Sequence, residues 1–216
     1  MSPLLQQRFP NVFAAIAAFQ AGRPVLLLDD DDREDEADIV AAAQNLSLQT
    51  MAMMIRDCSG IVCLCLDEAS VDALQLAPMV PNNQARHGTG FTVSIEAAEG
   101  VSTGVSAQDR ITTIEAALRS TAEQRHIVSP GHVFPLRARD GGVLTRRGHT
   151  EGSVDLALLA GLRPAAVLCE LMNPDGSMAR GEQVAVYARQ YNLPVLTIEE
   201  LAGCRQAMLE LQAEPA

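Results

Sequence analysis

An acidic run directly after an apolar segment holds the densest chemistry of this 216-residue chain. Val25–Leu28 is entirely aliphatic, and eight of the next ten residues, 29–38, are aspartate or glutamate. Neighbouring carboxylates repel one another unless water, a cation or a basic group neutralises them. Arg33 lies inside this acidic loop, where a guanidinium could hold a phosphate or a carboxylate. The loop therefore indicates a metal and anion site at the end of a strand. A solvated turn or an adventitious calcium site is the alternative.

A second polar segment, residues 130–151, contains two of the four histidines and four arginines. Its stretch Arg146–Thr150 runs into a predicted helix, whose first backbone N–H groups could bind a phosphate together with a guanidinium and a threonine hydroxyl. Gly148 would let the backbone approach the anion closely. His132 and His149 flank this stretch, and either could be a general base, a metal ligand or a structural histidine. The segment therefore predicts a phosphate cradle.

Three smaller features extend this candidate site. The turns at 88–93 and 102–106 carry hydroxyl groups, including that of Thr103, which suit sugar hydroxyls or phosphate oxygens. Glu170 lies within the apolar run Val167–Leu171, where a buried carboxylate would be costly to ionise. Such a group is a candidate general acid or base, with a buried ion pair to arginine as the rival explanation. Arg137 and Arg139 alternate as on one face of a strand and are expected to be solvated or paired.

Composition excludes several classes of function. The chain has no lysine, so a Schiff base with a carbonyl substrate is closed to it. Its net charge of −11 argues against nucleic acid as a partner. No apolar stretch is long enough to span a membrane and no secretion signal is evident, so a cytoplasmic protein is expected. The five cysteines contain no CxxC pair, which predicts buried reduced thiols.

Hydrophobic periodicity and turn residues predict a mixture of helices and strands. Helices are expected over 11–21, 48–55, 109–118, 154–162 and 182–190 and at the C-terminus, and strands over 25–28, 61–66, 91–95, 167–171 and 195–198. We find no internal repeat, linker or break in composition, so residues 1–216 are expected to form one domain. Because helices and strands do not alternate strictly, the predicted fold is α+β, with a mixed sheet flanked by helices.

Six segments, in this order, resemble the 3,4-dihydroxy-2-butanone 4-phosphate synthase family of riboflavin biosynthesis. They cover nearly the whole chain, and the acidic REDE loop with a downstream RxGHTE is highly specific to that family. The matching segments are 29–38 (DDDDREDEAD), 59–65 (SGIVCLC), 88–104 (GTGFTVSIEAAEGVSTG), 130–136 (PGHVFPL), 141–151 (GGVLTRRGHTE) and 167–171 (VLCEL). Ala37 stands where glycine is frequent in the family, a departure that removes no functional group.

The resemblance implies a carbon–carbon lyase that converts D-ribulose 5-phosphate to L-3,4-dihydroxy-2-butanone 4-phosphate and formate. It also implies a homodimer with active sites near the subunit interface. By resemblance, Glu34 and His149 bind a catalytic Mg²⁺, which Mn²⁺ could replace, and His132, Glu170 and Asp38 act in catalysis. The residues expected to bind substrate are Arg33, Glu34, Asp38, Thr103, Arg146, Arg147, Gly148, His149, Thr150 and Glu170. Since the chain lacks the cysteine cluster of a fused GTP cyclohydrolase II domain, we expect the monofunctional form.

The chemistry of these residue types agrees with those roles. A divalent cation on the ketose oxygens would acidify the adjacent C–H group, which replaces the Schiff base that this chain cannot form. A carboxylate or histidine would then move the protons, and Asp38 would act as a base or orient a hydroxyl. Two other functions stay open: a different metal-dependent lyase or isomerase of sugar phosphates, and a module that binds a divalent cation or a nucleotide without turnover.

Overall fold

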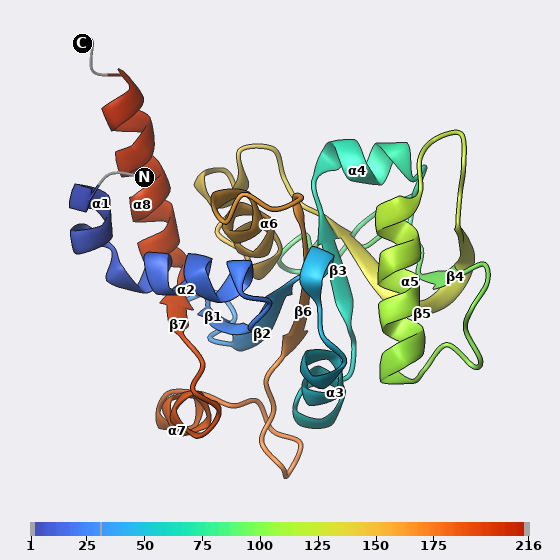
Figure 1. The fold of residues 1–216 in the computed structure, drawn as a ribbon, viewed down its shortest axis with the longest axis horizontal. Coiled ribbons are helices and arrows are strands. Elements are labelled where there is room, and N and C mark those ends of the chain that lie inside the picture. Colours follow the sequence, from blue (N-terminus) through green and yellow to red (C-terminus); the bar gives the residue numbers. More distant parts are fainter. Residues whose placement is uncertain (1–2, 31, 214–216) are drawn as a thin grey trace.

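A single mixed sheet organises the protein. The computed structural model describes residues 3–30 and 32–213, and within them seven strands pair in the order β4-β5-β3-β6-β2-β1-β7 (Figure 1). Pairs β1/β7 and β3/β5 are parallel, and the other four pairs are antiparallel. The strands are β1 Val25–Leu28, β2 Ala37–Ala42, β3 Cys63–Leu66, β4 Ile95–Ala97, β5 Ile127–Arg137, β6 Ala165–Glu170 and β7 Val195–Thr197. The predicted α+β class with a mixed sheet is confirmed.

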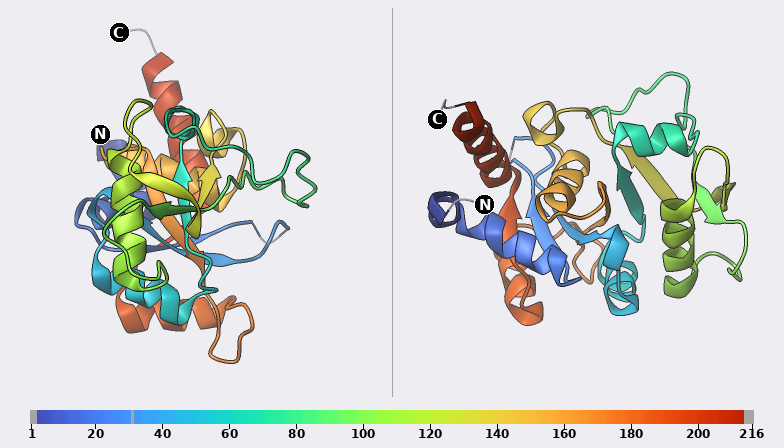
Figure 2. Two further views of the ribbon diagram at one scale, coloured as in Figure 1. Left: turned by 90° about the vertical axis from the view of Figure 1, so that its right-hand side faces the viewer. Right: turned by 45° about the horizontal axis from the view of Figure 1, so that its top comes forward.

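Helices cover both faces of this sheet (Figures 1 and 2). The helices are α1 Pro3–Arg8, α2 Pro10–Gln20, α3 Leu48–Asp57, α4 Glu68–Ala73, α5 Ala107–Arg119, α6 His149–Leu159, α7 Glu182–Tyr191 and α8 Ile198–Ala213. Side chains alternate between the faces of each strand, so Leu26 belongs to the core that residues of α3, α4, α5 and α7 also line, whereas Leu27 belongs to the core on the other face, with residues of α2, α6 and α8. The two cores hold the sheet rigidly between the helices.

Local sequence sets the helix ends. Ser47, Asp67 and Ser106 cap α3, α4 and α5, each accepting a hydrogen bond from a backbone N–H of the first turn. The N-cap of α6 is Gly148, which offers no side-chain acceptor to that helix. The first N–H groups of α6 are therefore left for another partner.

One edge of the sheet gathers the polar segments found in the sequence. The acidic loop connects β1 to β2 in an antiparallel hairpin. Asp38, near the start of β2, is paired with Glu170 at the end of β6. Ser59 lies beside the same end of β6, because its N–H donates to the Glu170 carbonyl. These contacts place the acidic loop, Asp38, Glu170 and the segment before β3 at one edge, which we call the site edge.

Most predicted elements are confirmed. The predicted helices 11–21, 48–55, 109–118 and 182–190 match α2, α3, α5 and α7, and four of the five predicted strands match β1, β3, β6 and β7. The helix predicted over 154–162 begins earlier, at His149. Elements α1, α4, β2 and β5 were not predicted. All five cysteines are free and buried, as expected.

The strand predicted over 91–95 is wrong. Phe91 and Thr92 form only isolated bridges, and regular pairing of this segment starts at Ile95. The Thr92 N–H donates to the carbonyl of Pro135 at 3.0 Å, but Pro135 has no N–H to return a bond. A continuous ladder therefore cannot form there.

Within the described part of the chain, no helix has the length and apolarity required to cross a membrane.

Candidate active site

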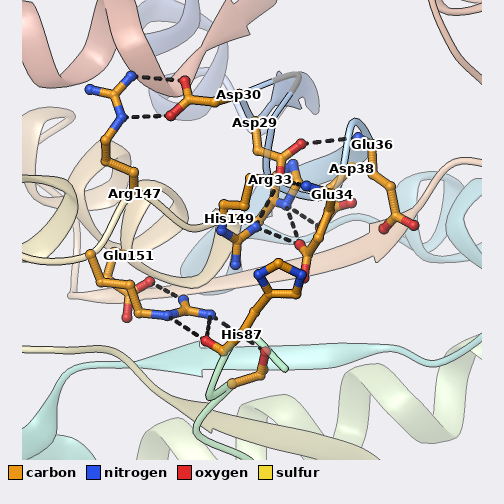
Figure 3. Close-up of polar contacts among 12 residues, drawn as sticks. Asp29, Asp30, Arg33, Glu34, Glu36, Asp38, His87, Arg147, His149 and Glu151 are labelled. Atoms are coloured by element: carbon orange, nitrogen blue, oxygen red, sulfur yellow. Dashed lines mark hydrogen bonds and ion pairs between the residues drawn. The ribbon is translucent and has the colours of Figure 1, made fainter. Parts of the chain in front are cut away.

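Asp29 organises the acidic loop from its first position. Its side chain is fully buried and accepts hydrogen bonds from the backbone N–H of Glu34 at 3.1 Å and of Glu36 at 3.0 Å. The Arg33 guanidinium donates to both Asp29 and Glu34. These bonds fold the loop back on itself and fix the position of the Glu34 carboxylate (Figure 3). Asp31 belongs to the predicted acidic run but lies outside the described residues.

Glu34, Asp38 and His149 form the centre of the site (Figure 3). His149 Nδ1 lies 3.8 Å from Glu34 Oε2 and 3.7 Å from Asp38 Oδ2. His149 and Asp38 are buried, at 6% and 2% side-chain exposure, and Glu34 is partly open. The structure thus brings together three residues that the sequence predicted as ligands, substrate contacts or acid/base groups.

The charges of this cluster are strongly coupled. Interaction with His149 lowers the pKa of Glu34 to about 2, against the opposing effect of desolvation and with help from Arg33. Desolvation raises the pKa of Asp38 to about 7, although His149 pulls it down. Desolvation lowers the pKa of His149, but Asp38 and Glu34 outweigh it and raise the value to about 9. At neutral pH the site therefore holds a cationic histidine against a permanently ionised Glu34.

A group that shares Glu34 and His149 with this cluster has the spacing of metal ligands. Single ligand atoms of Asp29, Glu34 and His149 lie within 4.8 Å of one another. Among the described residues, His149 Nε2 and Asp38 Oδ1 are buried without a hydrogen-bond partner. Buried polar atoms are costly to leave unpaired, so these two atoms fit contact with a bound cation or a polar substrate group. Carboxylate oxygens with one imidazole nitrogen suit Mg²⁺ and Mn²⁺.

The predicted phosphate cradle is only partly available for an anion. Arg146 donates to Glu151 and to the His87 carbonyl, so its guanidinium is already engaged inside the protein. Arg147 makes a two-pronged ion pair with Asp30, at 2.6 and 2.8 Å, which ties the acidic loop to the start of α6. A Cβ at Gly148 would overlap the Arg146–Glu151 pair, which explains the glycine there. The other members of the predicted cradle are the backbone N–H groups at the α6 N-terminus and the buried Thr150.

Glu170 lies at the site edge beside Asp38. It is half-buried rather than enclosed, because β6 ends there, and its Oε2 accepts a short hydrogen bond from the Ser59 hydroxyl. The rival explanation, a buried ion pair with arginine, is absent for this carboxylate within residues 3–30 and 32–213. Glu170 is therefore held by a neutral donor with its other oxygen available.

His132 and Thr103 lie away from this centre. His132 is in β5, three strand positions from Asp38 in β2, which corresponds to about 14 Å at the usual strand spacing. Its side chain is 47% exposed, and Thr103 is also exposed. Arg137 ion-pairs with Glu68 and Asp72, as expected for a paired arginine, and Arg139 is exposed. Within one chain, the structure does not bring His132 into contact with Glu34, Asp38 or His149.

Comparison with known proteins agrees with this geometry. The family model described as 3,4-dihydroxy-2-butanone 4-phosphate synthase matches residues 14–203. A protein of that name from Pseudomonas putida is 90% identical over 209 residues, covering 97% of each chain. The chain belongs to the 3,4-dihydroxy-2-butanone 4-phosphate synthase family. A Cupriavidus pinatubonensis family member is 64% identical over 196 residues, covering 91% of this chain and 88% of its own.

A solved structure of the family shares the fold. The crystal structure of a 3,4-dihydroxy-2-butanone 4-phosphate synthase in complex with two magnesium ions is 41% identical, with a TM-score of 0.81. The match covers 87% of this chain and 92% of that chain.

Sequence reasoning missed four residues that position others in this synthase-family site. Asp29 folds the acidic loop, Ser59 binds Glu170, Glu151 binds Arg146 and Glu96 binds His132. Asp29 and Glu151 stood inside segments already singled out, but nothing distinguished them from neighbouring acids. Ser59 and Glu96 act on residues 111 and 36 positions away, which a sequence read alone cannot pair.

Proposed function

We propose that this chain catalyses the reaction named by its family, converting D-ribulose 5-phosphate to L-3,4-dihydroxy-2-butanone 4-phosphate and formate in riboflavin biosynthesis. The observation that supports it most directly is the cluster of Glu34, Asp38 and His149, with its unpaired buried atoms at the mouth of a phosphate cradle. A ketose phosphate needs a cation for its oxygens, an anion site for its phosphate and bases for its C–H groups. All three lie at one sheet edge.

Glu34 and His149 are the proposed ligands of Mg²⁺, with Mn²⁺ as a possible replacement. The orphaned His149 Nε2 and the fixed Glu34 carboxylate fit such an ion, and a family member is described in complex with two magnesium ions. When bound, the ion polarises the ketose carbonyl and stabilises negative charge on the adjacent oxygens. Because His149 binds a proton in the metal-free protein, loading the site must release that proton.

Asp38 and Glu170 are the proposed acid/base groups nearest this centre. Asp38 is shielded from water, and its raised pKa of about 7 lets it accept or return a proton near neutral pH. Glu170 is adjacent across the β2/β6 pair, so each carboxylate is placed to take a proton from the same substrate and to return that proton to it. The Ser59 hydroxyl holds Glu170 in place.

The phosphate is proposed to bind at the start of α6. Thr150 and the first N–H groups of α6 are proposed to donate to its oxygens, and the lack of a side chain at Gly148 leaves room for the Arg146–Glu151 pair beside them. Arg33 and Arg147, which ion-pair with Asp29 and Asp30, are proposed to add positive charge, and Arg146 holds Glu151 at the start of α6. Thr103 is proposed to contact the same substrate, at the His132 end of the site.

A second copy of the chain is proposed to complete the site. His132 lies about 14 Å from Asp38 by strand spacing, and its exposed side chain is open to a partner chain. In a homodimer, His132 of one copy can lie over the metal cluster of the other. Equal amounts of His132→Asn and Glu34→Gln, mixed by unfolding and refolding, should then regain about one quarter of wild-type turnover, since half of the dimers contain one intact site. No regain would place His132 in the same chain's site or outside it.

Product analysis tests the proposed reaction. D-ribulose 5-phosphate incubated with Mg²⁺-loaded protein should give equimolar formate and a four-carbon phosphate, followed by ¹³C and ³¹P NMR. A five-carbon ketose or aldose phosphate without formate would instead identify a sugar-phosphate isomerase. Binding of the substrate without any product would identify a binding module.

A further inference from the structure

His132 is hydrogen-bonded to a carboxylate of its own chain. Its Nδ1 lies 2.6 Å from Oε2 of Glu96, although 36 residues separate the two in sequence. Glu96 is in β4 and is 13% exposed at its side chain, whereas His132 in the neighbouring β5 is 47% exposed. The carboxylate therefore supports the imidazole from behind, and the free side of the ring faces outward.

The hydrogen-bond directions around Glu96 are determined by its neighbours. The Ala97 N–H donates to Thr113 Oγ1 at 3.1 Å, so the threonine hydroxyl uses its own hydrogen toward Glu96 Oε1, at 2.8 Å. A carboxylate can only accept, so the second oxygen must receive the hydrogen of His132 Nδ1. The neutral imidazole is therefore in the Nδ1–H form, and Nε2 carries the lone pair.

The backbone turn at Gly104 packs tightly against the Glu96–His132 pair. Gly104 has φ of +84°, and a Cβ there would overlap both the Glu96 carboxylate and His132 Nδ1. Asp109 of α5 holds the turn in place by accepting from the N–H groups of Ser102 and Gly104, each at 3.1 Å. Thr113 is one turn further along the same helix. Helix α5 thus fixes both Glu96 and the turn that covers it.

We infer that Glu96 is the positioning residue of His132 in the proposed reaction. By holding the hydrogen on Nδ1, it leaves Nε2 to take a proton from a substrate C–H or O–H group. The broken bond leaves its electron pair on the substrate, and the proton forms the Nε2–H bond of an imidazolium that faces the Glu96 carboxylate. The same proton then returns to the substrate, which restores the neutral ring. This inference rests on the proposed function for the reaction served, but the fixed tautomer is a property of the protein itself.

The first test is Glu96→Gln, which keeps the shape of the side chain. With Thr113 donating to the amide oxygen, the amide NH₂ faces Nδ1 and requires the opposite tautomer. We expect kcat to fall about 10²- to 10⁴-fold with KM changed less than about threefold, the scale seen when a histidine is held in the wrong tautomer. Glu96→Asp keeps the charge and should recover part of kcat. Glu99→Gln, an exposed change of the same type three residues away, is the control and should match wild type.

The second test needs no turnover. ¹⁵N NMR of imidazole-labelled protein, with His132 assigned through His132→Asn, should show Nδ1–H in wild type and Nε2–H in Glu96→Gln. An unchanged tautomer, or kcat within threefold of wild type in a folded Glu96→Gln protein, overturns the inference. Absence of formate from the wild-type protein, with the tautomer switch observed, instead overturns the proposed reaction and leaves the Glu96–His132 pair established.

Discussion

Replacing Asp38 by asparagine should stabilise the metal-free protein while abolishing turnover. Asp38 is fully buried, and in the folded protein desolvation raises its pKa from 3.8 to about 7. A carboxyl whose pKa is raised on folding opposes folding once it ionises. At pH values below its unfolded pKa, Asp38 therefore does not lower the free energy of unfolding. It lowers this free energy increasingly as the pH rises toward 7. The protein keeps this charge at the expense of stability, as functional sites often do.

The size of the effect follows from the shift. About three pKa units at about 1.4 kcal/mol each give a cost of about 4 kcal/mol at pH 8. Asparagine removes this cost. The attraction to His149 needs no separate subtraction, because it is already included in the pKa of about 7. We therefore expect Asp38→Asn to gain about 4 kcal/mol at pH 8 and close to nothing at pH 4.

Urea unfolding in EDTA at pH 4, 6 and 8 measures this difference. Asp140→Asn, at an exposed position, is the control and should follow wild type throughout. A difference that is independent of pH, or an Asp38→Asn protein less stable than wild type at pH 8, would refute the assignment of a costly buried charge to Asp38.

Other substitutions test the ligands and the cradle. Glu34→Gln should weaken Mn²⁺ binding at least tenfold by electron paramagnetic resonance titration without loss of fold, and unchanged affinity would remove Glu34 from the ligand set. Arg146→Met should cost about 3–5 kcal/mol in urea unfolding, because it leaves Glu151, 1% exposed at its side chain, as an uncompensated buried charge. Arg146→Lys should raise KM for the sugar phosphate, because a lysine cannot bridge Glu151 and the His87 carbonyl together. An unchanged KM would show that Arg146 has no role in phosphate binding.

Much of the fold was predictable because its signals are local. The aliphatic run of β1, the amphipathic α2, α3, α5 and α7 and the glycine stops all follow from neighbouring residues. Strand β5 was missed because Pro130, Gly131 and Pro135 read as strand breakers, and β2 because its alanines have low strand propensity. The order of the strands depends on packing between distant segments, which a single sequence does not contain.

In the candidate site, too, features with local signals were predictable, whereas contacts between distant segments were not. The residues of the acidic loop and of the RRGHT stretch were identified by type and spacing, and the structure brings Glu34, Asp38 and His149 together. The engagement of Arg146 was not predictable, because its partners are a carboxylate five residues on and a carbonyl 59 residues back. The position of His132, away from the cluster in one chain, likewise depends on the strand order.

Formate release from D-ribulose 5-phosphate tests the central claim most directly. Metal-stripped protein, assayed through a formate dehydrogenase couple, should release no formate, and added Mg²⁺ should restore release in proportion to the protein present. Formate at the same rate in EDTA would contradict a metal site at Glu34 and His149. No formate under either condition would contradict the proposed reaction itself.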